Sequence, residues 1–290
     1  MLNAFVLLTP ETLEEAIKLY AEHDACKVLA GGTDVFVEMH EGKEYPILMD
    51  IKQLQELKGL SWSDEEGLCI GALTTYAELE RAEVVRKLYP ALIDGVTKTG
   101  SVQVRTRATL AGNLVTASPA GDSLGALLVY DAILRIQGLG GIREVPVAEF
   151  FTGYKKTLLK HGELITHILL PATLPNTGSA YIKVTRRKAM DIGVLGTSAR
   201  IVCDEDGVCT LARISLLAAA PTAIRAYEAE QYMVGKKITE EVMKHAGELA
   251  YKVAQPKTWR TNEEYSRDMF KVYVPKTIAA ALERMKKGAQ

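Results

Sequence analysis

The segment KVLAGGTDVFVEM, residues 27–39, most constrains the fold of this chain. It begins as a run typical of a buried strand, then places two adjacent glycines, a threonine and an aspartate where the run should continue. Glycine at the exit of a strand usually marks a place where another group approaches the backbone too closely for a Cβ atom. That group can be another strand, a turn or a ligand, and the local sequence leaves all three open.

Length and composition restrict the possible classes of protein. At 290 residues the chain is longer than an average domain, so we expect two domains or one domain with lobes. Hydrophobic residues at 48% and charged residues at 24% are ordinary for a globular protein. The 35 basic and 36 acidic residues nearly cancel, so no strong field would attract nucleic acid or anionic lipid. We therefore expect no nucleic-acid partner and no membrane partner.

Targeting and metal-binding signals are weak. The first ten residues lack the basic start of a signal peptide, and every apolar run is shorter than the roughly 20 residues that cross a bilayer, so we expect a cytoplasmic protein. The four cysteines form no Cys-x-x-Cys pair, which argues against zinc or an iron–sulfur cluster on this chain. Cys203 and Cys209 flank a turn-like DEDGV and are expected to be cross-strand neighbours. We assign no residue to a metal and none to catalysis.

The first hundred residues alternate strands and helices. Thr12 and Glu15 have capping-box spacing before a helix, and Thr75 and Glu78 repeat it at the head of a helix over residues 75–88. Strands are predicted at the following positions: 27–29, 46–51 and 68–74. This alternation indicates a mixed fold of helices and sheets.

Later segments change character. Residues 99–122 are too long and too polar for one regular element, and residues 124–137 read as a helix followed by a strand. The glycines in QGLGGIREVPV, residues 137–147, favour a hairpin over a dinucleotide-binding fingerprint. The chain then becomes strand-dominated and ends in helices, with Pro275 expected to kink or break the last one. One helical face over residues 242–253 is predicted to be buried, with the apolar stripe Val242, Ala246, Leu249, Ala250 and Val253. A proline-rich break predicts a boundary between domains 1–176 and 177–290.

Two polar loops, residues 30–34 and 109–113, share one design. Both combine small residues, whose amides can be reached, with polar side chains, which suits an anion such as a diphosphate. The glycines that would permit close approach and the side chains that would donate are Gly31, Gly32, Gly112, Thr33, Thr109 and Asn113. Neither loop has P-loop or Rossmann spacing, so from its glycines alone each loop reads first as a structural turn.

Two aspartates need their own interpretation. The carboxylate of Asp34 would repel a diphosphate unless another group turns it away, for example a hydroxyl or a backbone amide that donates to it. Asp122 precedes Ser123 at the start of a helix, so it is either an N-cap or an acceptor of ribose hydroxyls.

Taken together, these segments resemble the flavin-binding subunit of the molybdenum hydroxylases, the family of xanthine, nicotinate and carbon monoxide dehydrogenases. The resemblance is carried by LAGGTDVFVEM, TGSVQVRTRATLAGN, TASPAGDSLGALLVYDA, ELITHILLP, SAYIKVTRRKAMDIGVLG, APTAIRAYEAEQYMVGK and EEYSRDMFKVYV, in the expected order. It implies an α+β fold, with a vanillyl-alcohol-oxidase-like FAD-binding domain of two lobes. A smaller C-terminal domain with an antiparallel sheet and helices follows.

The resemblance also implies the cofactor and the residues that bind it. The first loop would wrap the diphosphate of FAD, the second would form its other wall, Asp122 would hold the ribose, and Ile165 and Lys183 would lie near the cofactor. Lys183 would tune the flavin potential, whereas its place on an alternating strand is otherwise typical of a solvated lysine. The implied FAD-binding residues are Lys27, Val28, Leu29, Ala30, Gly31, Gly32, Thr33, Asp34, Val35, Ala108, Thr109, Leu110, Ala111, Gly112, Asn113, Asp122, Ile165 and Lys183.

By the same resemblance, electrons would pass from two-iron two-sulfur clusters on a small subunit to the FAD and on to NAD or another acceptor. A large subunit would carry the molybdenum cofactor and oxidise the substrate, with a purine such as xanthine expected first. Alternatives are a nicotinate, aldehyde or carbon monoxide dehydrogenase, and a flavin-binding module without electron-transfer duty. One departure is that Ala108 and Ala111 stand where the family usually has glycines, which adds two methyl groups to the second wall.

Overall fold

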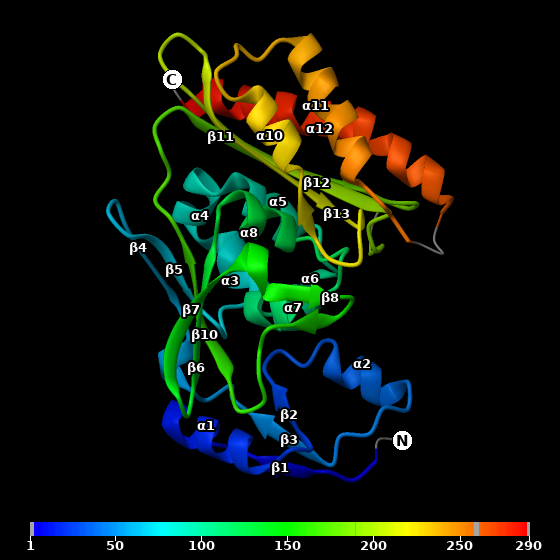
Figure 1. Ribbon diagram of the computed structural model, residues 1–290. Helices are drawn as coiled ribbons and strands as arrows, with labels where there is room; N and C mark the ends of the chain where they lie inside the picture. Colours follow the sequence, from blue (N-terminus) through cyan, green and yellow to red (C-terminus); the bar gives the residue numbers. More distant parts are fainter. Residues whose placement is uncertain (1–2, 189, 258–260, 289–290) are drawn as a thin grey trace.

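The computed structural model describes residues 3–188, 190–257 and 261–288 (Figure 1). Some residues of segments interpreted above lie outside this description, namely residues 1, 2 and 189. The same holds for part of the predicted second domain, namely residues 258–260, 289 and 290. The first third of the chain contains β1(Val6–Leu8), α1(Leu13–Glu22), β2(Cys26–Leu29), α2(Val35–His40), β3(Ile47–Asp50), η1(Gln55–Leu57), β4(Leu60–Ser63) and β5(Gly67–Gly71).

Helices dominate the middle of the chain before strands return. This part contains α3(Tyr76–Arg81), α4(Glu83–Leu88), α5(Pro90–Thr97), α6(Val102–Arg105), α7(Leu110–Thr116), α8(Leu124–Val129), β6(Ile133–Gly138), β7(Gly141–Pro146), α9(Val147–Phe150), β8(Phe151–Gly153), β9(Lys156–Thr157) and β10(Leu164–Leu170). The remainder contains β11(Thr177–Val184), β12(Leu195–Cys203), β13(Cys209–Leu217), β14(Ile224–Arg225), α10(Tyr227–Met233), α11(Glu240–Val253) and α12(Glu263–Gly288).

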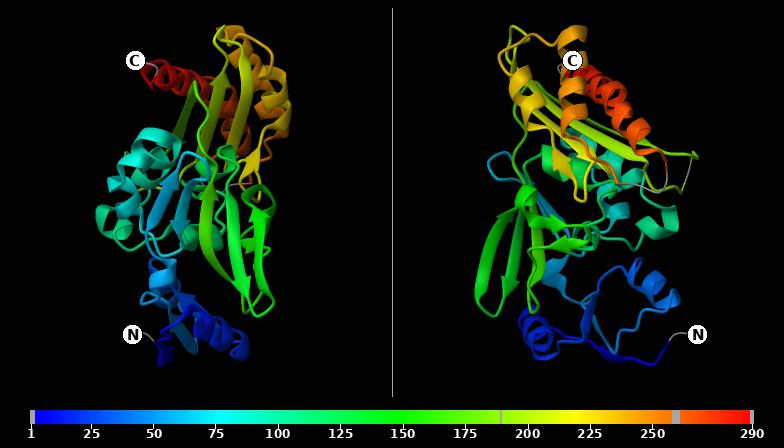
Figure 2. Two further views of the ribbon diagram at one scale, coloured as in Figure 1. Left: turned by 90° about the vertical axis from the view of Figure 1, so that its left-hand side faces the viewer. Right: turned by 45° about the vertical axis from the view of Figure 1, so that its right-hand side comes forward.

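The N-terminal part is built on two sheets, which lie in separate lobes (Figures 1 and 2). A parallel sheet of order β1-β3-β2 forms the first lobe, and an antiparallel sheet of order β4-β5-β10-β6-β7 belongs to the second. The predicted hairpin is confirmed, since Gly138 pairs with Gly141 across a two-residue turn between β6 and β7. The loop after β2 leaves the carboxyl end of a parallel strand, which is where such sheets expose backbone to ligands.

The C-terminal part is an antiparallel sheet of order β11-β12-β13-β14, packed between two layers of helices (Figure 1). Helices α10 and α12 lie against one face with α11 packed on both of them, and α5 and α8 of the N-terminal part lie against the other face. The predicted buried stripe of α11 is confirmed, because Ala246 and Ala250 are fully buried in this core. Cys203 and Cys209 are indeed cross-strand partners, in register between β12 and β13.

Three local predictions need comment. The capping box at Thr75 and Glu78 forms, but the helix predicted over residues 75–88 is two helices, because the chain is extended at Ala82 between α3 and α4. Pro275 does not break the last helix, since α12 runs through it continuously. Among the described residues, none of the helices is both long and apolar enough to span a membrane.

Candidate cofactor site

The two polar loops converge. A Cβ atom built on Gly31, in the first loop, would lie only 2.1 Å from the carbonyl oxygen of Arg107, at the entrance to the second loop. The second loop is fastened to the start of α3, because the N–H of Tyr76 donates to the carbonyl of Ala108 at 2.9 Å. Segments that lie more than seventy positions apart in the sequence are therefore in backbone contact.

This contact corrects the interpretation of the glycine pair. Gly31 lacks a side chain because the space beside it is filled by the chain's own carbonyl group, so this glycine does not open a gap for a ligand. Gly32 has a left-handed φ of +77°, which other residues rarely adopt. The two glycines therefore shape the loop and bring it against its neighbour, and the remaining atoms of the loop are what a ligand could meet.

The first loop presents main-chain donors. Among the hydrogen bonds of the described residues, none has an N–H group of residues 31–35 as its donor. In the second loop Thr109 is the N-cap of α7, and its side-chain oxygen accepts the N–H of Gly112 at 3.0 Å. An accepting hydroxyl keeps its own hydrogen for a further bond. A run of unpaired amides beside a capped helix start fits an anionic diphosphate, since both supply partial positive charge.

Asp34 is turned away from these amides. Its side chain makes no cap bond to α2, and its Oδ2 accepts the hydroxyl of Thr116, at the end of α7, at 2.7 Å. The carbonyl of Gly112, 3.0 Å from the same hydroxyl oxygen, shares its single hydrogen. The expected hydroxyl partner of Asp34 thus exists, and it joins the first loop to the last residue of α7. The second predicted loop is in fact mostly helical, because Thr109 caps α7 and residues 110–113 form its first turn. Sequence reasoning missed Thr116, because nothing in a threonine at a helix end marks a partner 82 positions away.

Asp122 is the most buried acidic group of the site, with 6% of its surface exposed. The hydroxyl of Tyr181 donates to its Oδ1 at 2.6 Å, and the ammonium of Lys183 donates to its Oδ2 at 2.7 Å. The N-cap interpretation is wrong, because Ser123 occupies the cap position of α8 and the carboxylate of Asp122 points to β11. Burial raises the pKa of Asp122, and the charge of Lys183 opposes that rise.

Lys183 is not a solvated strand residue. Its side chain is 7% exposed and donates to the carbonyl of Lys98 as well as to Asp122. Such a buried ammonium is stable because a carboxylate and a carbonyl accept its hydrogens. Tyr181, two positions earlier on the same strand face, had not been identified from the sequence, where a tyrosine in an alternating strand reads as ordinary core.

The other predicted residues line the surroundings of the two loops. Ala108 and Ala111 are buried in the main core, so their methyl groups are packed against protein, as is Ile165 on β10. Asn113 accepts the hydroxyl of Ser123 at 2.8 Å, which holds its amide in place. In the first lobe, residues 27–29 form most of β2, and Val35 packs with Leu29 in a small separate core. Ala30 packs against the main core, and Leu110 is fully buried there.

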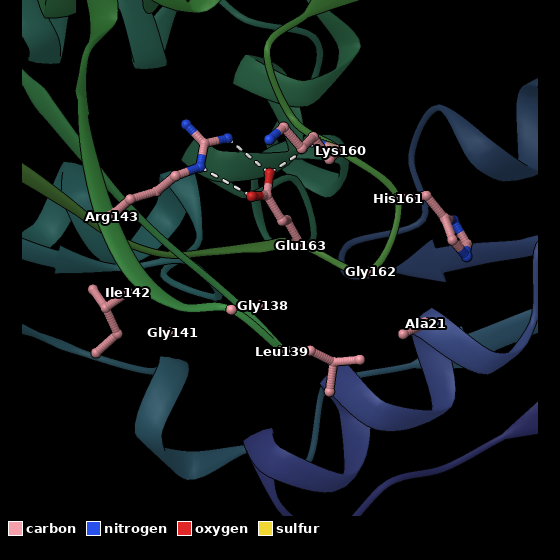
Figure 3. Close-up of a pocket in the computed structure, with 11 residues that line it drawn as sticks. Ala21, Gly138, Leu139, Gly141, Ile142, Arg143, Lys160, His161, Gly162 and Glu163 are labelled. Carbon is pink, nitrogen blue, oxygen red and sulfur yellow. Dashed lines mark hydrogen bonds and ion pairs between the residues drawn. The ribbon is translucent and has the colours of Figure 1, made fainter.

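A separate pocket lies at the tip of the β6–β7 hairpin, beside α1 (Figure 3). It holds about 400 Å³ and is lined by Arg143, Lys160, His161 and Glu163 among others, but by no residue of the two loops. Arg143 donates twice to Glu163, at 2.9 and 2.7 Å, so the charges in this pocket are largely neutralised by each other. The convergent loops, and not this pocket, match the sequence motifs.

Comparison with known proteins identifies the family. The family described as "FAD binding domain in molybdopterin dehydrogenase" matches residues 3–173, and "CO dehydrogenase flavoprotein C-terminal domain" matches residues 180–281. The xanthine dehydrogenase FAD-binding subunit of Escherichia coli O157:H7 is 32% identical over 274 residues, which cover 93% of this chain and 94% of that protein. The nicotinate dehydrogenase FAD-subunit of Eubacterium barkeri is 31% identical, with 82% of each chain covered.

Solved structures agree. The structure of carbon monoxide dehydrogenase from Hydrogenophaga pseudoflava superposes with a TM-score of 0.93 at 29% identity, covering 98% of this chain and 99% of the compared chain. The match spans both the N-terminal and the C-terminal parts. This chain therefore belongs to the FAD-binding subunits of the molybdenum hydroxylase family, and it is an oxidoreductase subunit.

Proposed function

We propose that this chain carries FAD as the electron-transfer subunit of a xanthine dehydrogenase-type purine hydroxylase. It would receive electrons from iron–sulfur clusters on a small partner subunit and deliver them to NAD or another acceptor. A large partner subunit would hold the molybdenum cofactor and the substrate. The observation that carries the proposal is the convergence of the two loops, with the unpaired amides of residues 31–35 beside the capped start of α7.

The residues present fit FAD. The amides of the first loop and the hydroxyl of Thr109 would hold the diphosphate, and Asp122 would accept the ribose hydroxyls. The methyl groups of Ala108 and Ala111 are buried in the core, which favours unhindered binding despite the replaced glycines. When bound, FAD takes electrons singly and releases them as a hydride. The protein's part is to hold the cofactor in position and to supply the positive charge of Lys183.

We also propose the finer description of the fold. Residues 1–176 would form a vanillyl-alcohol-oxidase-like FAD-binding domain, and residues 177–290 a second domain. The separate sheets of the two lobes and the distinct hydrophobic core of the C-terminal part support this division.

The substrate class rests on the relatives. A xanthine dehydrogenase subunit at 32% identity supports a purine, while the nicotinate dehydrogenase subunit at 31% makes nicotinate the second candidate. Because substrate-selecting residues would lie on the large subunit, reconstitution with that subunit distinguishes the two.

The test begins with the purified chain and added FAD. We expect one FAD per chain, measured by flavin absorbance after desalting, and bleaching of that absorbance when the chain is reconstituted with its large and small partners and given xanthine under anaerobic conditions. Parallel reactions with nicotinate, an aldehyde and carbon monoxide identify the substrate, and titration with NADH tests the acceptor. A chain that takes up no FAD refutes the proposal, and a flavin that binds but resists all these reductants favours a binding module without electron-transfer duty.

A further inference from the structure

Strand β11 of the C-terminal part reaches into the candidate cofactor site. Residues two apart on a strand lie on the same face, so Ser179, Tyr181 and Lys183 all point from β11 towards the N-terminal part. Each makes a specific contact there. The hydroxyl of Ser179 is bonded to that of Tyr130, while Tyr181 and Lys183 both donate to Asp122.

The position of this strand is fixed from both sides. The carboxylate of Asp94, on α5, accepts the backbone N–H of Tyr181 at 3.0 Å. The same carboxylate receives two hydrogen bonds from Arg284 of α12, at 2.6 and 2.9 Å, and Arg284 also donates to the carbonyl of Ser179 at 3.0 Å. A bidentate pair of this kind defines geometry more tightly than a single bond. The register of Tyr181 relative to α5 is therefore set by an arginine from the far side of the sheet.

We propose that Tyr181 is a positioning residue of the cofactor site, which holds the Asp122 carboxylate ionised and oriented so that it can accept the sugar hydroxyls of FAD. The inference rests on the proposed function, because it requires that Asp122 contacts the cofactor. A carboxylate has about four acceptor positions. Tyr181 occupies one position on Oδ1, and Lys183 and the more distant hydroxyl of Thr99, at 3.4 Å, take those on Oδ2, which leaves a position on Oδ1 for a ligand.

The chemistry of the pair supports this role. The phenol is fully buried, and burial raises the pKa of Tyr181 well above its ordinary value, so the group remains a hydrogen-bond donor across the working pH range. Asp122 is itself buried, which disfavours its charge, and each donor offsets part of that penalty. The ionisable groups that act on the Asp122 carboxylate are Tyr181 and Lys183, both on β11, and Tyr76 on α3. Asp94 on α5 and Lys98 at its end instead bond the backbone of Tyr181.

The experiment compares FAD affinity across pH for the full-length chain, three single variants and one double variant. Tyr181→Phe keeps the ring and removes the donor, so we expect FAD to bind about tenfold more weakly at neutral pH, because the less firmly held carboxylate loses about one hydrogen bond to the sugar. We also expect the decline of affinity in acid to begin at a higher pH, because a less stabilised carboxylate is protonated earlier. The control is Tyr130→Phe, which removes another fully buried hydroxyl bonded to the same strand but not to Asp122.

The control separates a positioning role from a structural one. Tyr130→Phe should lower the melting temperature without moving the pH profile. Asp122→Asn provides the second arm, because the effect of Tyr181→Phe should largely vanish when the carboxylate is absent. If Tyr181→Phe costs the same affinity in the Asp122→Asn background, or leaves the profile unchanged while the wild-type chain binds FAD, the inference is wrong and the proposed function survives. A wild-type chain that binds no FAD overturns both.

Discussion

Replacing Gly31 by alanine tests whether contact between the two loops builds the cofactor site. The new methyl group would lie 2.1 Å from the carbonyl oxygen of Arg107, whereas real Cβ atoms essentially never come closer than 3.0 Å to another atom. Both sides of the contact are backbone, so neither can relieve the clash by changing a rotamer. The loops must therefore separate by roughly 1 Å, the difference between those two distances.

The size of the effect follows from what that separation disrupts. Overpacking of this kind costs about 2 kcal/mol, which corresponds to a fall in Tm of roughly 4 °C for a chain of this size. A movement of 1 Å also removes at least one hydrogen bond to a charged diphosphate, worth about 2 kcal/mol. Since 1.4 kcal/mol is a tenfold change, the Kd for FAD should rise about 30-fold.

Quenching of flavin fluorescence during titration of the apoprotein measures the affinity, and differential scanning calorimetry measures the stability. Gly140→Ala is the matched control, because it adds the same methyl group at a turn where no atom lies within 4 Å. It should leave both quantities nearly unchanged. Wild-type affinity in Gly31→Ala, with a normal Tm, would show that the loops do not depend on this contact and would refute the reasoning.

Three further substitutions test separate contacts. Thr116→Val removes the hydroxyl that holds Asp34, and we expect FAD to bind about fivefold more weakly because the freed carboxylate can approach the diphosphate. Glu163→Gln tests how the stability of the fold depends on pH. Hydrogen bonds from Arg143 lower the pKa of Glu163 in the folded chain. The ionised carboxylate therefore stabilises the fold above its unfolded-state pKa, and this stabilisation is lost as pH falls through the lowered folded-state pKa. The variant should thus melt earlier than wild type at neutral pH but equally in acid. Arg284→Lys should lower the free energy of unfolding by about 1 kcal/mol in urea titrations, because lysine cannot make the bidentate pair and the site is partly exposed. An unchanged Kd, a stability difference that persists in acid, or an unchanged unfolding midpoint would contradict the respective expectation.

Most of the local structure could be predicted from neighbouring residues. The capping box at Thr75 and Glu78, the hairpin at Gly138 and Gly141 and the buried stripe of α11 all depend on interactions within a few positions, where residue type and spacing carry the information. At Thr12 the predicted box is only half formed, because the carboxylate of Glu15 accepts the N–H of Glu11. Predictions failed where a short local preference competed with packing. The helix predicted over residues 75–88 divides at the extended residue Ala82. Helix α12 runs through Pro275, because a helix packed against a sheet gains more from packing than one lost hydrogen bond costs.

The amino-acid sequence by itself determined which backbone segments are bare and polar, and in which order they occur, and that order was enough to recognise the family. Only the tertiary structure decided what those segments meet. Gly31 faces a carbonyl group of the second loop, Asp34 finds Thr116, and Asp122 is held by Tyr181 from 59 positions away. The physical reason is the separation of the interacting residues along the sequence. A turn or a helix cap is formed by residues a few positions apart, whereas the partner of a buried carboxylate depends on how whole sheets and helices pack.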